Sequence, residues 1–430
     1  MFRTLKAPIT VQIEVTEGCD NVCRHCYNFF RHQGYRNKTL TKEQADKIIS
    51  EFKDLQVIRG VITGGEPLLA PDLVVHLANQ MRALGMGIMF NSNLTLFNET
   101  IGKRMQESGI GSIMTSLIAD DPAIHDFVTQ QTGSWEKTTN NIKLAIKMGF
   151  RVMVNMVLTK WNYHRLQQTG DLVGSWGVKK FGATRACPPG PIAPQFTENL
   201  ISIEELRSSL QTLYELQEKW GYRVDVFEHY PWCALGDVKK YHYLARRKCT
   251  AGVTSASIGA SGQMRPCGHS SMTYGNVFEE GIQAPWLRMT EWRKQKYSSA
   301  CQSCRHYRSC TGGCAVDAQN SERKLDHHMT CENDVSSLPG KELLPTIGDN
   351  DSYSFIPQAI LRKEEFGGII ASGKVGAVYV DKQAFDILKA VRSRSHFTAK
   401  SISNEFQVEI ESTRDILARL ESQHLTKKGG

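Results

Sequence analysis

The first 185 residues alternate short apolar runs with longer amphipathic stretches. The apolar runs predict strands at Ile9–Val15, Val57–Thr63, Gly87–Phe90, Ser112–Leu117, Val152–Leu158 and Val178–Ala183. The amphipathic stretches predict helices at Thr41–Leu55, Pro71–Leu84 and Trp135–Met148. Repeated strand–helix units favour a parallel sheet with helices outside it, so we expect an α/β fold. About six such units would make a partial (β/α)6 TIM-like barrel with its site at the carboxyl ends of the strands.

The pattern changes after residue 200. Ile201–Trp220 predicts a long helix that begins with a capping box and bridges to the next unit. Residues 247–335 are rich in Cys and Gly and poor in long periodic segments, so we expect a metal to hold this part together. Pro and Gly residues mark 336–354 as a linker.

Residues 355–430 predict a small winged-helix-like α+β unit. Its expected strands lie near Ala359–Leu361, Gly368–Ala371 and Ala377–Val380, and its helices near Lys382–Ala390, Ala399–Phe406 and Ser412–Ser422. The chain therefore divides into residues 1–200, 201–246, 247–335, 336–354 and 355–430.

Length and composition restrict the class of protein. A chain of 430 residues is too long for one compact core. We expect no membrane span, because no apolar run reaches about 18 residues, and Met1–Pro8 has no signal-peptide core. The expected location is the cytoplasm, where thiols stay reduced, so the 12 cysteines indicate metal or cluster ligands. The net charge of +8 fits either a solvated basic surface or an acidic partner.

The first group of cysteines follows the first predicted strand directly. Cys19, Cys23 and Cys26 lie on one tight loop and can hold three irons of a [4Fe–4S] cluster. The fourth iron would then be open to a chelating small molecule. The alternative is a zinc loop or a set of redox thiols, but structural zinc prefers four protein ligands and this loop offers three.

This spacing resembles the signature of the radical S-adenosylmethionine (SAM) superfamily. Relatives often have an aromatic residue before the last cysteine, where this chain has His25. Gly64-Gly65-Glu66-Pro67 ends the second predicted strand and is similar to the glycine-rich motif that receives the methionyl amino group, with Glu66 able to pair with an ammonium. The resemblance places further SAM contacts at strand ends, namely Asn91, Asn93, Ser116 and Asn155. Each of these polar residues is also a plausible strand-end cap.

The resemblance implies the chemistry. SAM would chelate the open iron, and an electron from a flavodoxin or ferredoxin reductant would lead to its cleavage. The product would be a 5′-deoxyadenosyl radical that takes a hydrogen atom from a substrate. The protein would supply orientation and exclusion of water.

Seven cysteines form the second group. Two, five and three residues separate Cys301, Cys304, Cys310 and Cys314, and this spacing is similar to the SPASM domain that follows many radical SAM cores. The resemblance implies two auxiliary clusters. Their ligands would be Cys301, Cys304, Cys310 and Cys331 for one, and Cys249, Cys267 and Cys314 for the other. The alternative is a zinc ribbon that uses the same cysteines.

The second ligand set is one residue short. Some relatives have an extra cysteine soon after the first, but Ala251–Ser255 contains none. Either a residue from elsewhere closes this cluster or one position stays open. Cys233 is the nearest spare cysteine in sequence, whereas Cys187 ends a predicted barrel strand and is expected at the mouth of the active site. Each is equally compatible with a buried apolar role.

Residues 355–430 resemble the PqqD-like peptide-recognition domain, in which a leader peptide adds a strand to the small sheet. The alternative is a generic winged helix, whose DNA contacts would come from Arg392, Arg394, Lys400, Arg414 and Arg419. Fusion to a radical SAM core favours peptide binding, so nucleic acid is not the expected partner.

The expected function is a radical SAM enzyme that modifies a ribosomally made precursor peptide. The modification would be a cross-link or another oxidative or backbone change. A sulfatase-maturating, formylglycine-forming enzyme is one alternative, but relatives of that type have an acidic residue after the equivalent of Cys267, where this chain has Gly268-His269. A non-enzymatic iron–sulfur DNA-binding regulator is the other.

Overall fold

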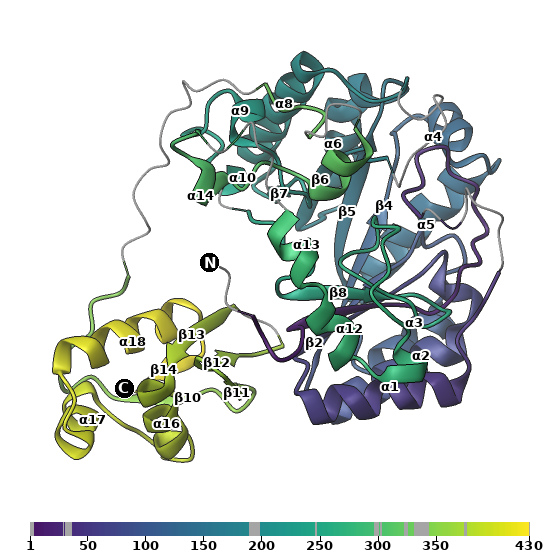
Figure 1. Ribbon diagram of the computed structural model, residues 1–430. Coiled ribbons are helices and arrows are strands. Elements are labelled where there is room, and N and C mark those ends of the chain that lie inside the picture. The colour runs from purple at the N-terminus through teal and green to yellow at the C-terminus, as the bar shows by residue number, and fades with distance from the viewer. Residues whose placement is uncertain are drawn as a thin grey trace.

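The structure is a computed structural model, shown as a ribbon in Figure 1. It describes residues 4–28, 30, 37–188, 198–245, 247–295, 301, 303–321, 326–330, 344–373 and 376–429.

Six parallel strands form the centre of the fold. They lie side by side in chain order, and every neighbouring pair is parallel. Their bounds are β1 (Thr10–Glu14), β2 (Arg59–Thr63), β3 (Gly87–Asn91), β4 (Ser112–Ser116), β5 (Arg151–Leu158) and β6 (Lys180–Arg185). This confirms the α/β fold and the parallel sheet expected from the sequence.

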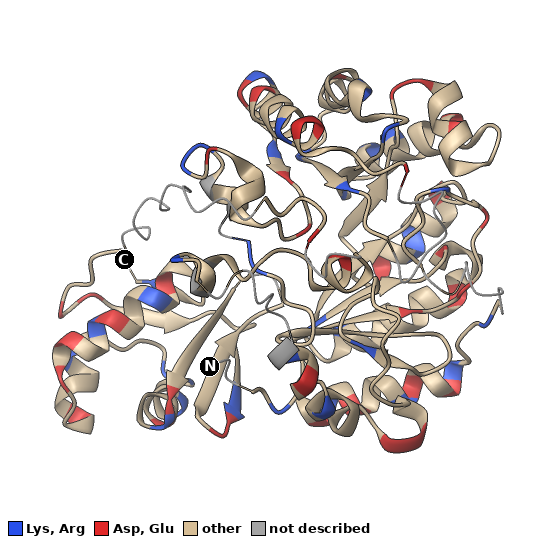
Figure 2. Ribbon diagram, turned by 45° about the horizontal axis from the view of Figure 1, so that its top comes forward, with Lys and Arg blue, Asp and Glu red and all other residues tan. Residues whose placement is uncertain are grey.

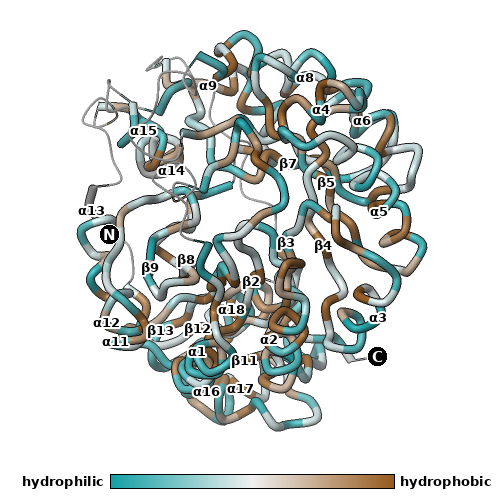
Figure 3. The backbone as a smooth tube through the Cα atoms, turned by 90° about the vertical axis from the view of Figure 1, so that its right-hand side faces the viewer, coloured by the Kyte–Doolittle hydropathy of each residue, from teal (hydrophilic) through white to brown (hydrophobic). Residues whose placement is uncertain are grey.

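Helices cover the outside of this sheet. They are α1 (Lys42–Leu55), α2 (Pro71–Ala83), α3 (Glu99–Glu107), α4 (Pro122–Thr129), α5 (Ser134–Lys147) and α6 (Leu166–Ser175). The predicted capping box of α1 is present, because Thr41 Oγ1 accepts from Gln44 N and Gln44 Oε1 accepts from Thr41 N. Hydrophilic residues lie along the outer turns of helices such as α1 and α8 (Figure 3). The sequence did not predict α3, α4 and α6, which are short or contain Gly.

The central sheet is wider than six strands. β7 (Arg223–Asp225) pairs with β6 after the bridging helix α8 (Ile203–Trp220), whose predicted capping box is also present. On the other side, β8 (Ser255–Ile258) pairs with β1 and carries β9 (Met264–Arg265). A buried ion pair between Arg265 and Glu14 ties β9 to the first strand. Strands of two to four residues are too short to give a detectable period, so the sequence did not predict them.

Short helices make up most of the cysteine-rich part. They are α9 (Trp232–Leu235), α10 (His242–Ala245), α11 (Val277–Glu280), α12 (Gln283–Arg288), α13 (Thr290–Gln295), α14 (Tyr307–Cys310) and α15 (Ala315–Asn320). Two buried tryptophans anchor this part, since Trp286 Nε1 donates to Leu5 O at 2.7 Å and Trp292 Nε1 donates to Ala251 O at 3.0 Å. The hydrophobic core of this part is therefore continuous with that of the barrel.

The C-terminal unit has a hydrophobic core of its own, formed by residues between Ile347 and Leu425. An antiparallel sheet of β11 (Ile360–Glu364), β12 (Gly367–Ala371) and β13 (Ala377–Asp381) is followed by three helices, as the sequence predicted. The helices are α16 (Lys382–Val391), α17 (Ala399–Phe406) and α18 (Ile410–Ser422). The sequence did not predict the pairing of β10 (Tyr353–Phe355) with β14 (Thr426–Lys428).

The C-terminal unit is attached at the amino ends of the barrel strands, where it lies beside α1 and β2 in Figure 1. Arg362 on β11 is fully buried and donates to Ala7 O at 2.8 Å, Pro8 O at 2.9 Å and Gln56 O at 3.3 Å. Its Nε also donates to Glu364 Oε1 at 2.8 Å. This unit and the carboxyl ends of the strands therefore lie at opposite ends of the barrel.

Within the described residues, no helix is long and apolar enough to cross a bilayer.

Candidate functional site

A cavity of about 440 Å³ opens at the carboxyl ends of the barrel strands. This is the end of the sheet where the sequence placed the site. Its wall includes residues from both cysteine groups, which lie more than 200 positions apart in the chain. The cysteines in the wall are Cys19, Cys23, Cys26, Cys187, Cys249, Cys267 and Cys314.

The first cysteine loop runs from β1 across the carboxyl end of α4. Val22 N donates to Thr129 O at 3.0 Å, and Arg24 N donates to Val128 O at 2.9 Å. The Arg24 guanidinium also lies 4.4 Å above the ring of Phe127. These contacts fix the loop so that all three of its thiols line one side of the cavity.

The glycine-rich turn after β2 packs directly against this loop. Gly65 N donates to Thr16 O at 2.7 Å, and Glu66 N donates to Gly18 O at 2.6 Å. A Cβ on Gly65 would lie 2.0 Å from Gly18 O, and a Cβ on Gly64, whose φ is +153°, would lie 2.5 Å from Thr16 O. Because these neighbours are backbone atoms, only glycine fits at either position.

Glu66 lies beneath the cavity and is not part of its wall. The carboxylate is completely buried and accepts from Leu68 N at 2.9 Å, Ser92 Oγ at 2.8 Å and Asn93 N at 2.8 Å. Burial raises the pKa of Glu66 to about 7. Its oxygens hold the segment after β3, and the pairing of Glu66 with a ligand ammonium stays a prediction. Pro67 begins the short 3-10 helix η2 (Pro67–Leu69) and is buried as well.

The four polar residues expected at strand ends all lie in the cavity wall, namely Asn91, Asn93, Ser116 and Asn155. Asn93 Nδ2 donates to Asp20 Oδ1 at 2.8 Å, which links the end of β3 to the cysteine loop. Asn155 Oδ1 accepts from Thr184 Oγ1 at 2.9 Å. Asn93 and Asn155 thus bind neighbouring side chains, and Asn155 lies within β5 rather than at its end.

Several buried polar atoms in the same wall have unmet hydrogen-bonding capacity, including side-chain oxygens of Asn28, Asn91 and Thr115. Across the described ranges, Asn91 Oδ1 and Thr115 Oγ1 make no hydrogen bond. Buried polar atoms are nearly always paired, so these two indicate a polar ligand. The sequence did not identify Thr115, because nothing in the pattern distinguishes a threonine next to the end of a strand.

Three histidines line the cavity as well, namely His25, His125 and His269, of which His125 is almost completely buried. Burial lowers the pKa of each to about 4, so these imidazoles are neutral at pH 7. Ile118 N donates to His125 Nδ1 at 3.2 Å, and the ring of His269 lies 4.3 Å from that of Tyr27. None of the three rings adds a positive charge to the wall near neutral pH.

The second cysteine set meets at the far side of the cavity. The Cys314 thiol lies close enough to those of Cys249 and Cys267 to interact with both electrostatically. Cys187 is buried, and its thiol makes a hydrogen bond with that of Cys314. The Sγ atoms of Cys187 and Cys314 and a carboxylate oxygen of Glu228 all lie within 4.8 Å of one another.

Cys233 lies elsewhere. It is the residue after Trp232, whose backbone N–H donates to Cys310 Sγ at 3.2 Å, and it interacts electrostatically with Cys310. Cys304 interacts with the same thiol. Cys233 is therefore a neighbour of the Cys301, Cys304 and Cys310 set, and the proposal that it completes the other set does not fit the structure. Cys331 lies outside the described residues.

Arg185, at the end of β6, connects the two sides of the cavity. Its guanidinium is buried and donates to Asp326 Oδ1 at 2.8 Å and Asp326 Oδ2 at 2.6 Å. It also contacts Glu228 at 3.3 Å and lies 4.9 Å above the ring of Tyr230. The sequence analysis did not assign a role to Arg185, because its partners are 43 and 141 residues away along the chain.

Comparisons with known proteins agree with this geometry. Residues 13–173 match the Radical SAM superfamily. The chain is 28% identical to the mycofactocin maturase MftC of Mycobacterium tuberculosis over 325 residues, 73% of this chain and 79% of that one. It is 24% identical to an AdoMet-dependent heme synthase of Nitratidesulfovibrio vulgaris over 323 residues, 71% and 87%. It is 23% identical to the PqqA peptide cyclase of Bradyrhizobium diazoefficiens over 345 residues, 73% and 83%.

Solved structures show the same fold. Streptococcus suis SuiB bound to precursor peptide SuiA aligns with a TM-score of 0.62 at 18% identity, over 76% of each chain. The enzyme anSMEcpe with bound AdoMet aligns with a TM-score of 0.60 at 15% identity, over 74% of this chain and 93% of that one. The chain is thus an enzyme that carries a radical SAM domain over residues 13–173.

Proposed function

We propose that this enzyme uses radical SAM chemistry to modify a ribosomally made precursor peptide. The observation that carries the proposal is one cavity whose wall holds the three-cysteine loop, the glycine turn and the second cysteine set together. Relatives named for mycofactocin maturation and PqqA cyclisation support a peptide substrate.

The first half of the cavity fits a cluster and SAM. Cys19, Cys23 and Cys26 would hold three irons of the [4Fe–4S] cluster. Gly64 and Gly65 pack tightly against the backbone of the cysteine loop and line the same cavity, so they would hold the loop beside the ligand. Bound SAM supplies a 5′-deoxyadenosyl radical after one-electron cleavage. Asn91 Oδ1 and Thr115 Oγ1 offer two of the unmet hydrogen-bonding atoms described above, while Ser116 and Asn155 add polar atoms to the wall.

The second half of the cavity fits an auxiliary centre next to the substrate. Cys249, Cys267 and Cys314 would supply thiolates there, while Cys301, Cys304, Cys310 and Cys331 would hold another centre further out. Soft thiolates favour iron–sulfur clusters, and the two sets supply little else as ligands. A flavodoxin or ferredoxin would supply the reducing electron.

The C-terminal unit offers a place for the leader peptide. The β11 side of its sheet faces residues 6–8, since Lys6 N donates to Glu364 Oε2 at 2.7 Å. Among the described strands, none pairs with the outer edge of β13. An extended leader segment would add there as a fourth strand, held by main-chain hydrogen bonds.

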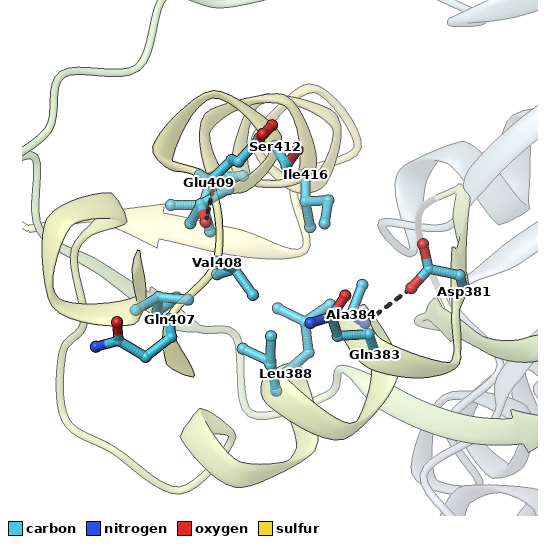
Figure 4. A pocket seen from close by; sticks show the side chains of 13 residues that line it. Asp381, Gln383, Ala384, Leu388, Gln407, Val408, Glu409, Ser412 and Ile416 are labelled. Atoms are coloured by element: carbon cyan, nitrogen blue, oxygen red, sulfur yellow. Dashed lines mark hydrogen bonds between the residues drawn. The ribbon is translucent and has the colours of Figure 1, made fainter. Parts of the chain in front are cut away.

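An apolar groove continues from the end of β13. It has a volume of about 360 Å³ and lies between α16, α17 and α18 (Figure 4). Leu388, Val408 and Ile416 point into it, with Asp381 at its edge. The groove would take apolar leader side chains, which would add specificity to the strand pairing.

The basic residues of this unit argue against DNA binding. Arg394 pairs with Glu405, Arg414 with Asp349 and Arg419 with Asp415. Arg392 donates to backbone carbonyls, including Pro357 O at 3.0 Å. Acidic and basic residues alternate along these helices in Figure 2. Charges paired in this way are less available to phosphates, which weighs against the regulator alternative.

A formylglycine-forming activity is the enzymatic alternative that the sequence left open. Here Gly268 and His269 follow Cys267, and both lie against Tyr27. Desolvation lowers the pKa of His269 to about 4, so this side chain is neutral at pH 7 and does not provide the acidic group expected of that enzyme type.

The test begins with anaerobic reconstitution of the full chain with iron and sulfide, followed by dithionite and SAM. We expect 5′-deoxyadenosine from the wild type and none from Cys23→Ala. Absence of 5′-deoxyadenosine from the reconstituted wild type would refute the radical chemistry.

The substrate is tested by co-expression with short peptides encoded beside the gene, and mass spectrometry identifies the modified one. Ile416→Asp should weaken leader binding at least tenfold, because it places a charge in the apolar groove. The matched control is Leu287→Asp, which changes an exposed leucine on α12. Equal leader binding by both variants would place the leader elsewhere.

A further inference from the structure

The second cysteine set contains three members in the cysteine-rich segment, although four ligands complete a cluster. We propose that Cys187, from the end of barrel strand β6, is the fourth ligand of the Cys249, Cys267 and Cys314 centre. This inference rests on the proposed function, because it takes that centre to be an iron–sulfur cluster.

Geometry places Cys187 with this set. Its thiol lies in the wall of the same cavity as Cys249 and Cys267. Its Sγ is within 4.8 Å of Cys314 Sγ, and the side chain is only 4% exposed. Ligands from two distant segments thus converge on the wall of one cavity.

A chain of hydrogen bonds holds these ligands at a fixed separation. Asp326 accepts from Arg185 through both oxygens, and its Oδ2 also accepts from Cys314 N at 2.7 Å. Arg185 is two residues before Cys187, and Arg185 N donates to the Tyr230 hydroxyl at 3.1 Å. One carboxylate therefore positions both the end of β6 and the backbone of Cys314. Outer contacts of this kind orient ligands before the metal arrives.

The other nearby groups are less suitable as the fourth ligand. The oxygens of Glu228 are both engaged by Arg185, at 3.3 and 3.4 Å. Thiolates are also the preferred ligands of iron–sulfur clusters, whereas carboxylates suit harder cations. Cys233 lies beside Cys310, in the other set.

Two consequences follow from this assignment. The centre would have four protein thiolates and would offer no open iron to the substrate peptide. It would also link the barrel covalently, through iron, to the cysteine-rich segment at the wall of the reaction cavity.

The test uses the full chain in a Cys19→Ala, Cys23→Ala, Cys26→Ala background, which keeps the auxiliary centres alone. Two cubanes give about eight irons per chain in this parent. Iron, acid-labile sulfide, and EPR and Mössbauer spectra are compared for Cys187→Ala, Cys187→Ser and Cys233→Ala after anaerobic reconstitution.

We expect Cys187→Ala to lose at least one iron per chain and to give a three-iron EPR signal. Cys187→Ser is nearly isosteric, so it should keep the fold and change the spectrum through oxygen ligation. Cys233→Ala should match the parent. Added cyanide should alter the spectrum of Cys187→Ala and leave that of the parent unchanged.

Parent-like iron content and spectra in both Cys187 variants would overturn the assignment, and so would loss of iron in Cys233→Ala alone. SAM cleavage by the wild type is measured separately. Failure of SAM cleavage would refute the proposed function. The iron content of the Cys187 variants would still show whether Cys187 is a ligand, so the two failures can be distinguished.

Discussion

Replacing Arg362 should loosen the C-terminal unit from the barrel. Arg362 is fully buried, makes three hydrogen bonds to backbone carbonyls of the barrel and pairs with Glu364, which is also buried. Arg362→Ala removes one partner of this buried pair and leaves the Glu364 carboxylate in a site without water. Such a change costs about 3–5 kcal/mol.

Arg394→Ala is the matched control. Arg394 pairs with Glu405 at 2.6 Å, but these side chains are 34% and 46% exposed. Solvent screening leaves such an exposed pair with little effect on stability. The two variants thus remove the same type of ion pair, one at the interface with the barrel and one within the C-terminal unit.

The assays are denaturant unfolding of the reconstituted full chain and limited proteolysis. Arg362→Ala should lower the free energy of unfolding by several kcal/mol more than Arg394→Ala and should speed cleavage before residue 360. Modification of a leader-bearing peptide should slow, whereas SAM cleavage without peptide should not change. Apolar replacement of both partners, Arg362→Met with Glu364→Leu, should recover most of the lost stability. Equal unfolding free energies for Arg362→Ala and Arg394→Ala would refute this account of the interface.

Three further outcomes follow from the structure. Gly65→Ala should abolish 5′-deoxyadenosine formation, because its Cβ would lie 2.0 Å from Gly18 O, whereas Gly111→Ala, which meets nothing within 4 Å, should be neutral. Glu66→Gln should weaken SAM binding by about 1–3 kcal/mol, because the amide group of the new glutamine would face the Asn93 N–H. Equilibrium titration measures this, and unchanged affinity would contradict the role given to Glu66. Peptides whose leader and modified residue are separated by fewer than about eight extended residues should not react in cis, because the eight-residue strand β5 alone is about 26 Å long. A spacer-deletion series read by mass spectrometry checks this, with leader supplied in trans as its control.

The sequence predicted the parts of the fold that have a clear period. Helices α1 and α8 carry capping boxes together with a repeating apolar face, so their starts were predicted to within two residues. Strands β7, β8 and β9 have two to four residues each and contribute no such pattern. β7 pairs with the edge of β6, β8 pairs with the edge of β1, and β9 then pairs with β8. These edges exist only once the barrel has folded.

The same distinction applies to the site. Cys19, Cys23 and Cys26 lie within eight positions of one another, so their spacing alone indicates a shared ligand. The glycine turn was also predictable, but the three hydrogen bonds of Glu66 were not. Their donors come from the turn itself and from the segment after β3, and no local pattern shows that these segments meet.

Cys187 shows why a ligand from a distant segment escapes prediction by spacing. Its distance to Cys314 depends on Arg185 and Asp326, and those two residues are 141 positions apart. No local pattern records such a contact. The buried Arg185 is itself a signal, however, because a buried guanidinium requires several acceptors from packed neighbours. Here the acceptors include Asp326 of the cysteine-rich segment, so the same charge pairing brings the barrel cysteine to the second set.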